Sequence, residues 1–150
     1  GKPLPGAVDF LNYAAENGYD VYYITNRKEK YRAATLENLR KFNFPFAKDA
    51  HLLMRTDERS KVNRRAKVSE DHRIVLLMGD NLSDFAGIFD HKTVEERLAL
   101  TEKNKDKFGF EYIALPNAMY GAWLQALYNY EDALSFEEKR TLMLKHLKGF

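Results

Sequence analysis

Residues 74–84 of the chain read IVLLMGDNLSD, and this stretch decides the fold class. Its first five residues are all apolar, which is typical of a strand buried inside a parallel sheet. The turn that follows starts at Gly79 and carries two carboxylates four residues apart, Asp80 and Asp84. Such a pair suits a hard cation like Mg²⁺, which takes one or two protein carboxylates and keeps several waters. An ordinary Asp–Asn turn, followed by a helix that Ser83 caps, explains the same residues equally well.

Apolar runs alternate with helical patterns along the rest of the chain. Strands are predicted at residues 21–24, 51–54, 74–78 and 112–115. Helices are predicted from Pro5-Gly6 to Asn17-Gly18, and at residues 29–42, 60–68, 93–108, 120–130 and 136–147. This alternation predicts an α/β fold in one domain of residues 1–150, with a mostly parallel sheet covered on both faces. In such sheets ligands bind outside the carboxyl ends of the strands, so the candidates for chemistry are found there.

The composition narrows the classes of function. The formal net charge is +2, which gives no reason to expect nucleic acid or an anionic membrane as a partner. The chain has no cysteine, so disulfides and zinc–thiolate sites within it are excluded. No apolar run is long enough to span a membrane. The four histidines show no metal-binding spacing and are interpreted as surface or structural residues: His51, His72, His91 and His146.

Two further polar positions suit a phosphate. Thr25 and Asn26 directly follow a predicted strand, where a hydroxyl and a backbone N–H can both donate to a phosphoryl oxygen. Helix capping is the commoner role of a threonine at such a place. Lys61 falls in the first turn of a predicted helix, where the helix N-terminus attracts anions and an ammonium strengthens the attraction. The basic residues after it are expected mostly to face water: Arg64, Arg65 and Lys67.

Together these segments resemble a known family. VYYITNR (residues 21–27) and LLMGDNLSDF (76–85) are similar to the second and fourth motifs of haloacid dehalogenase-type phosphatases, and Lys61 resembles the third. With PLPGAVDFLNYAAENGYDVYYITNR (3–27) and ALPNAMYGAW (114–123), the resemblance narrows to the class C acid phosphatases. These are bacterial secreted or lipid-anchored enzymes that include nucleotidases. The resemblance implies the three-layer, Rossmann-like haloacid dehalogenase fold.

The resemblance also implies roles for individual residues. Thr25, with help from the backbone at Asn26, would hold a phosphoryl oxygen. Lys61 would neutralise the phosphate and pair with the nucleophile. Asp80 would bind Mg²⁺ directly, and Asp84 would act close by or through water.

A tyrosine in the last of these segments is a candidate for substrate recognition. Tyr120 would stack on a substrate ring, although core packing of Tyr120 and Trp123 at the head of a helix is an equally good interpretation. The implied activity is Mg²⁺-dependent hydrolysis of small phosphate monoesters, with nucleoside 5′-monophosphates as one substrate class. By resemblance alone, the enzyme would work outside the cell or at its surface, and a homodimer is compatible with it.

One motif of the family is missing. The family carries an Asp-x-Asp at the end of its first strand, and its first aspartate attacks phosphorus while the second acts as acid and base. No Asp-x-Asp occurs in this sequence, since Asp9 lies inside a predicted helix and Asp20 precedes a strand. Hydrolysis of phosphate monoesters needs accelerations of up to about 10²¹-fold, which a lysine and a partial metal site do not supply. We therefore expect a central strand with the nucleophile to lie upstream of Gly1 in a longer protein.

Two other functions remain open at this point. One is a non-catalytic binding module that keeps the fold. The other is an intracellular sugar or nucleotide phosphatase of the same superfamily. An Asp-x-Asp after an apolar run upstream would favour an enzyme, and a signal peptide with a lipid-accepting cysteine would argue against the intracellular one.

Overall fold

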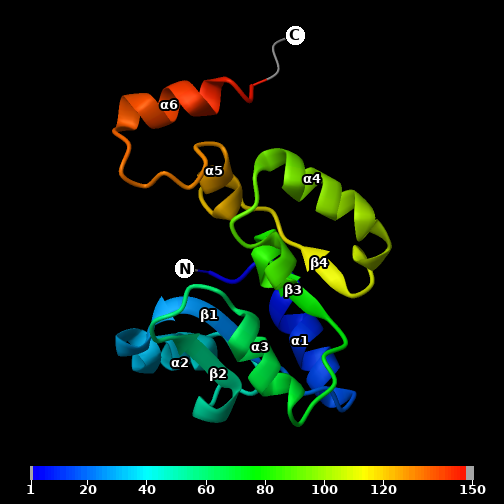
Figure 1. Ribbon diagram of the computed structural model, residues 1–150. Coiled ribbons are helices and arrows are strands. Elements are labelled where there is room, and N and C mark those ends of the chain that lie inside the picture. Colours follow the sequence, from blue (N-terminus) through cyan, green and yellow to red (C-terminus); the bar gives the residue numbers. More distant parts are fainter. Residues whose placement is uncertain (1, 148–150) are drawn as a thin grey trace. The chain divides into compact units, whose positions relative to one another are not determined.

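The computed structural model describes residues 2–147, and the chain separates into two compact units, Gly1–Ala66 and Lys67–Phe150. Figure 1 labels the elements of both. Each unit holds one pair of parallel strands with helices beside it.

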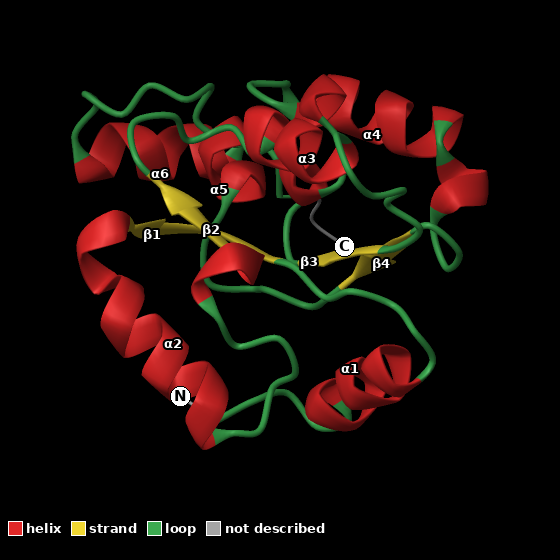
Figure 2. Cartoon of the chain, turned by 90° about the horizontal axis from the view of Figure 1, so that it is seen from below, coloured by secondary structure: helices red, strands yellow, loops and turns green. Residues whose placement is uncertain are grey.

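The first unit contains α1 (Ala7–Glu16), β1 (Tyr23–Lys28), α2 (Arg32–Lys41), β2 (Leu52–Arg55) and the start of α3 (Val62–Ser69). Tyr23 pairs with Leu52 and Ile24 with Leu53, after which the register breaks until Lys28 pairs with Arg55. A small core of Leu36, Leu52 and Met54 packs with Tyr23. Figure 2 shows α2 on one side of this strand pair, and Arg32 at its start donates from Nη1 to the carbonyl of Leu52 at 3.1 Å.

The second unit contains β3 (Leu77–Gly79), α4 (Val94–Lys103), β4 (Tyr112–Ala114), α5 (Ala122–Ala126) and α6 (Phe136–Leu144). β3 and β4 run parallel, with Leu77 opposite Tyr112 and Gly79 opposite Ala114, and α4 lies beside them (Figure 2). Phe85 is buried and stacks on Tyr112 with ring centroids 4.9 Å apart. This packing anchors the segment that leads from β3 towards α4.

The predicted α/β order with parallel strands is confirmed, but the strands do not form one sheet. They form two sheets of two strands each, β1–β2 and β3–β4. The physical reason is that, within residues 2–147, no strand pairs with both β1 and β3. A buried strand was expected over residues 74–78, yet β3 has only three residues and Met78 is 38% exposed.

Several element boundaries also differ from the expected ones. The strand predicted at residues 21–24 runs as β1 to Lys28, so Thr25 and Asn26 lie inside a strand rather than after it. The helix predicted over 93–108 ends at Lys103, where Asn104 closes it before a short 3₁₀ turn. The helix predicted over 120–130 is reduced to the five residues of α5.

Candidate functional site

The loop after β3, residues 79–84, folds the Asp84 carboxylate back over its own backbone; we call it the aspartate loop. Asp84 Oδ2 accepts from the backbone N–H groups of Asp80 and Asn81, each at 3.1 Å. Asn81 and Asp84 form a reciprocal capping box around a short 3₁₀ turn at Leu82–Asp84. A Cβ at Gly79 would lie 2.4 Å from the Asp84 Cβ, so this close approach requires glycine.

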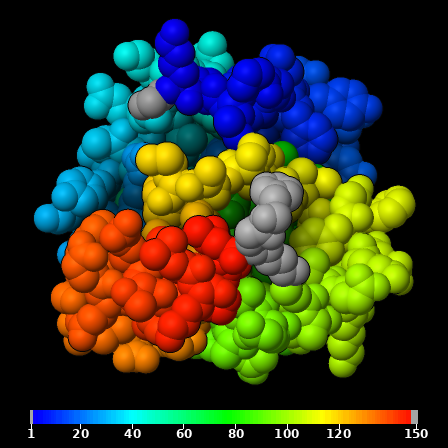
Figure 3. Space-filling view, turned by 90° about the horizontal axis from the view of Figure 1, so that it is seen from above, coloured from blue at the N-terminus to red at the C-terminus, as the bar shows by residue number. Residues whose placement is uncertain are grey.

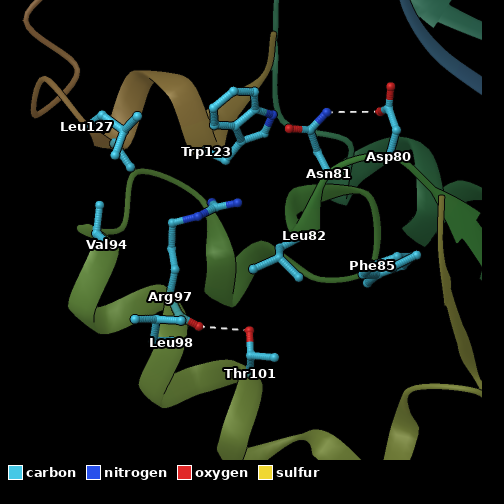
Figure 4. A pocket seen from close by; sticks show the side chains of 12 residues that line it. Asp80, Asn81, Leu82, Phe85, Val94, Arg97, Leu98, Thr101, Trp123 and Leu127 are labelled. Carbon is cyan, nitrogen blue, oxygen red and sulfur yellow. Dashed lines mark hydrogen bonds between the residues drawn. The ribbon is translucent and has the colours of Figure 1, made fainter. Parts of the chain in front are cut away.

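The Asp80 carboxylate is exposed and held by two amide side chains. Asn81 Nδ2 donates to Oδ1 at 2.9 Å (Figure 4), and Asn117 Nδ2 donates to Oδ2 at 2.7 Å. Each carboxylate oxygen offers more than one acceptor direction, so both can still face a cation. Amide donors that orient a carboxylate are what a metal ligand needs from its surroundings.

The same two asparagines tie the aspartate loop to the segment after β4. Asn117 Oδ1 accepts from the backbone N–H of Met119 at 3.0 Å, and Asn81 Oδ1 accepts from that of Ala122 at 3.0 Å. Gly121 has φ 144°, and a Cβ there would lie 2.1 Å from Asn81 Oδ1. Sequence reasoning missed Asn117, and the only sign of it was its position two residues after the end of a predicted strand.

Tyr120 and Trp123 lie in different surroundings. Tyr120 is 68% exposed, so core packing does not account for it. Trp123 lines a cavity of about 330 Å³ between α4 and α5, beside Asp80 and Asn81. Figure 4 shows Arg97 of α4 reaching into the same space. Arg97 is buried and donates from Nη1 to the carbonyl of Phe89 at 3.3 Å.

In the first unit, the phosphate-binding candidates lie at the register break of β1. Thr25 Oγ1 accepts from the backbone N–H of Arg27 at 3.2 Å. Because this bond uses the hydroxyl as an acceptor, the hydroxyl proton can be donated to another oxygen. Bulges of this kind re-aim side chains and are over-represented beside active sites.

Lys61 lies immediately before α3 rather than in its first turn. The carbonyl of Lys61 accepts from the backbone N–H of Arg65 at 3.0 Å, which makes Lys61 the N-cap residue. Ser60 Oγ accepts from the backbone N–H of Val62 at 3.3 Å. The expectation of a helix that starts near Ser60 is therefore correct to within two residues.

Arg64 joins Thr25 and Asn26 to the start of α3, and the expectation that it faces water is wrong. Its Nη1 donates to the carbonyl of Thr25 at 2.6 Å, and its Nη2 donates to Asn26 Oδ1 at 2.6 Å and to the carbonyl of Ser60 at 2.9 Å. Burial lowers the pKa of Arg64 from its usual value, and the Glu58 carboxylate opposes this change. Arg65 is also buried, whereas Lys67 is exposed as expected.

Two carboxylates of the aspartate loop have the chemistry that a divalent cation such as Mg²⁺ would require. Asp80 and Asp84 offer carboxylate oxygens of the kind this ion prefers, one pre-oriented by amides and the other bound to the loop backbone. Across residues 2–147, no group of three or more His, Cys, Asp or Glu side chains gathers in a way that holds a metal. The donor set therefore fits a cation that takes its remaining ligands from water, substrate or other protein groups.

One of the four histidines, His51, lies in a packed environment of the first unit. His51 is buried, its Nδ1 lies 2.9 Å from the carbonyl of Val21, and its ring stacks between Tyr22 and Phe46. This confirms a structural role for His51.

Comparison with known proteins decides the family. Residues 1–123 match the family described as HAD superfamily, subfamily IIIB (acid phosphatase). The chain belongs to this family. The structure is also similar to that of the class C acid phosphatase from Bacillus anthracis, with a TM-score of 0.93 and 44% sequence identity over 98% of this chain. The same values relate it to that phosphatase with tungstate bound.

Membership in subfamily IIIB confirms the resemblance to class C acid phosphatases and the haloacid dehalogenase-like fold class. The chain spans 62% of the length of the Bacillus anthracis phosphatase. Among the helices of residues 2–147, none is long and apolar enough to cross a membrane.

Proposed function

We propose that the complete protein hydrolyses small phosphate monoesters with the help of Mg²⁺, through an aspartyl-phosphate whose nucleophile lies outside these residues. The observation that carries the proposal is the arrangement of the Asp80 carboxylate. One of its oxygens accepts from the amide of Asn81 and the other from the amide of Asn117. The Asp84 carboxylate in turn accepts from the backbone N–H of Asp80. A carboxylate oriented in this way suits a metal ligand, and the chain belongs to an acid phosphatase family.

The phosphate would be held by Thr25, Asn26 and Lys61. The Thr25 hydroxyl proton and the backbone N–H of Asn26 can donate to phosphoryl oxygens, and the Lys61 ammonium adds positive charge. Phosphoryl transfer depends mainly on positioning and on stabilising charge, so these groups act without a change in their own bonding.

Asp80 would hold the Mg²⁺ ion directly, and Asp84 would act next to it or through water. When bound, Mg²⁺ neutralises charge that develops on the transferring phosphoryl group. The chain's own contribution is to keep both carboxylates in place before the ion and the substrate arrive.

Tyr120 is the proposed contact for the organic part of the substrate. Its ring is 68% exposed and follows Asn117, whose side chain also binds Asp80. An exposed aromatic ring on the segment that contacts Asp80 suits stacking on a nucleobase, which favours nucleoside 5′-monophosphates as substrates. The resemblance to class C acid phosphatases favours a secreted or lipid-anchored enzyme, and a homodimer is compatible with that resemblance.

The test is hydrolysis of p-nitrophenyl phosphate by the complete protein as Mg²⁺ is titrated. Lys61→Met is expected to reduce kcat by orders of magnitude without changing the melting curve, because it removes charge from the phosphate site. Lys67→Met is the matched control, since Lys67 is an exposed lysine of the helix that Lys61 precedes. A complete protein that binds phosphate esters but hydrolyses none would instead be a non-catalytic binding module.

The nucleotide preference has its own test. Tyr120→Ala should raise KM for nucleoside 5′-monophosphates several-fold and leave KM for glycerol phosphate unchanged, because only the former offers a ring to stack on. Equal effects on both esters would remove Tyr120 from substrate recognition.

A further inference from the structure

The Arg64 guanidinium donates hydrogen bonds to oxygens of the protein itself. Its two terminal nitrogens reach acceptors on two segments that are far apart in sequence. One is the register break of β1, through the carbonyl of Thr25 and Asn26 Oδ1, and the other is the loop before α3, through the carbonyl of Ser60. The two shortest of these bonds, at 2.6 Å, both go to β1.

The carbonyl of Thr25 determines where the next backbone N–H points. No cis peptide bond occurs in residues 2–147, so the Asn26 N–H points opposite to the Thr25 carbonyl within a planar peptide. By holding that carbonyl, Arg64 directs the Asn26 N–H away from itself. The same guanidinium also binds the Asn26 side chain. Turning the Thr25–Asn26 peptide would therefore strain the hydrogen bonds that Arg64 makes to both residues.

From this geometry we infer that Arg64 is a positioning residue of the phosphate site, which fixes the Thr25–Asn26 peptide relative to the segment that carries Lys61. The inference rests on the proposed function and deepens it. Arg64 acts through Thr25 and Asn26, since the nitrogens that face this region already donate to protein oxygens. The planar guanidinium presents separate nitrogens to the two segments in a fixed geometry, which the compact ammonium of lysine does not reproduce.

The inference predicts that Arg64→Lys is not conservative. In the complete enzyme, Arg64→Lys and Arg64→Ala are expected to lower kcat/KM by about 10- to 100-fold, because a displaced phosphate donor costs this much. In the same variants the inhibition constant of inorganic phosphate should rise, because phosphate binds more weakly. The Mg²⁺ concentration for half-maximal activity should stay unchanged. Lys67→Ala, which removes an exposed charge from the same helix, should change none of these values.

A double-mutant cycle separates positioning from direct contact. If Arg64 acts through Asn26, then Asn26→Ala and Arg64→Lys together should cost little more than the worse single variant. Losses that multiply would mean that Arg64 contacts the phosphate independently, and would overturn the inference. Added guanidinium should restore part of the phosphate affinity of Arg64→Ala.

Failure of the inference is distinguishable from failure of the proposed function. A wild-type enzyme without phosphatase activity would sink the proposed function. An active wild-type enzyme whose Arg64 variants keep the phosphate inhibition constant would sink the inference alone. A lower melting temperature with an unchanged inhibition constant would also overturn it, because Arg64 would then be only structural.

Discussion

At the scale of single residues, the charge of Asp80 is the feature whose removal should be most damaging. Asp80→Asn keeps the shape of the side chain but loses the charge that attracts a hard cation. In the complete protein, Mg²⁺-dependent hydrolysis is expected to fall to background, and calorimetry should show weaker Mg²⁺ binding. Asp71→Asn, at an exposed turn outside the aspartate loop, is the control. Near-normal rates in Asp80→Asn at ordinary Mg²⁺ would remove Asp80 from the site.

Gly79 tests whether the position of Asp84 matters separately from its charge. In Gly79→Ala the new Cβ would meet the Asp84 side chain at 2.4 Å, so the carboxylate must leave the backbone N–H groups it binds. We expect this variant to need a higher Mg²⁺ concentration for half-maximal activity.

The control for Gly79 is Gly109→Ala. Gly109 has φ 88°, which strains the backbone of an alanine placed there. A Cβ at this position would have nothing within 4 Å, so it would touch no site residue. It should lower the melting temperature without changing the Mg²⁺ requirement. The same Mg²⁺ shift in both variants would point to a general loss of stability instead.

The residues of the site differ in how far sequence could predict them. Asp80 and Asp84 could be named as candidates because both carboxylates lie in one glycine-started turn of the sequence. Asn117 and Arg64 were not, because each acts on a residue more than 30 positions away: Asn117 on Asp80, and Arg64 on Thr25. A lone asparagine in a loop or an arginine on a helix gives no local sign of the partner it will reach.

At the scale of elements, α4 and α6 both begin with a capping box. Thr93 and Glu96 form a capping box at α4, and Ser135 and Glu138 form one at α6. Thr93→Ala is expected to lower the free energy of unfolding by about 1 kcal/mol, the usual cost of losing such a cap. Urea unfolding of the complete protein, followed by circular dichroism, measures it.

Ser135→Ala is the matched control for Thr93→Ala. No residue of α6 is buried, and Phe136 is 76% exposed, whereas α4 buries Arg97. Figure 3 shows α6 and the segment before it, in orange to red, as a surface block. Loss of the α6 cap should therefore fray that helix without lowering the global stability. Equal losses from both variants would show that α6 unfolds together with the rest.

The α4 cap should also depend on pH. The hydrogen bond from the Thr93 backbone, followed by that from Lys92, lowers the pKa of Glu96 below its usual value. A lowered folded-state pKa means that the stabilisation is present above the ordinary glutamate pKa and is lost as pH falls through the folded-state value. Stability measured down this acid range should therefore fall less steeply in Glu96→Gln than in the unmodified protein.

The strand content was the most misleading part of the sequence. Residues 74–78 look like a strand buried on both sides, yet Val75 is 45% exposed and Met78 is 38% exposed. An apolar pattern indicates that a segment suits a buried strand, but burial also requires neighbouring strands. Within the described chain, β3 has only β4 as a partner. Pairing partners outside a sequence cannot be read from its own periodicity.

At the scale of the whole molecule, residues 1–150 produced alone are expected to be inactive and to self-associate. Activity should be missing because no Asp-x-Asp occurs in the sequence. Association is expected because each described sheet has only two strands, which leaves one edge of every strand without a ladder partner. Two-stranded sheets are at best marginally stable in water, and open edges recruit other chains.

Light scattering on the isolated chain, with p-nitrophenyl phosphate hydrolysis alongside, tests both parts of this expectation. A synthetic peptide that holds an apolar strand followed by Asp-x-Asp should reduce the association, because it can extend the hydrogen-bond ladder of an open edge. The same peptide with a proline in the middle of the strand is the control, since proline removes a ladder donor. If the isolated chain were monomeric, unfolded cooperatively and hydrolysed the ester with Mg²⁺, then a nucleophile among these residues would have been overlooked.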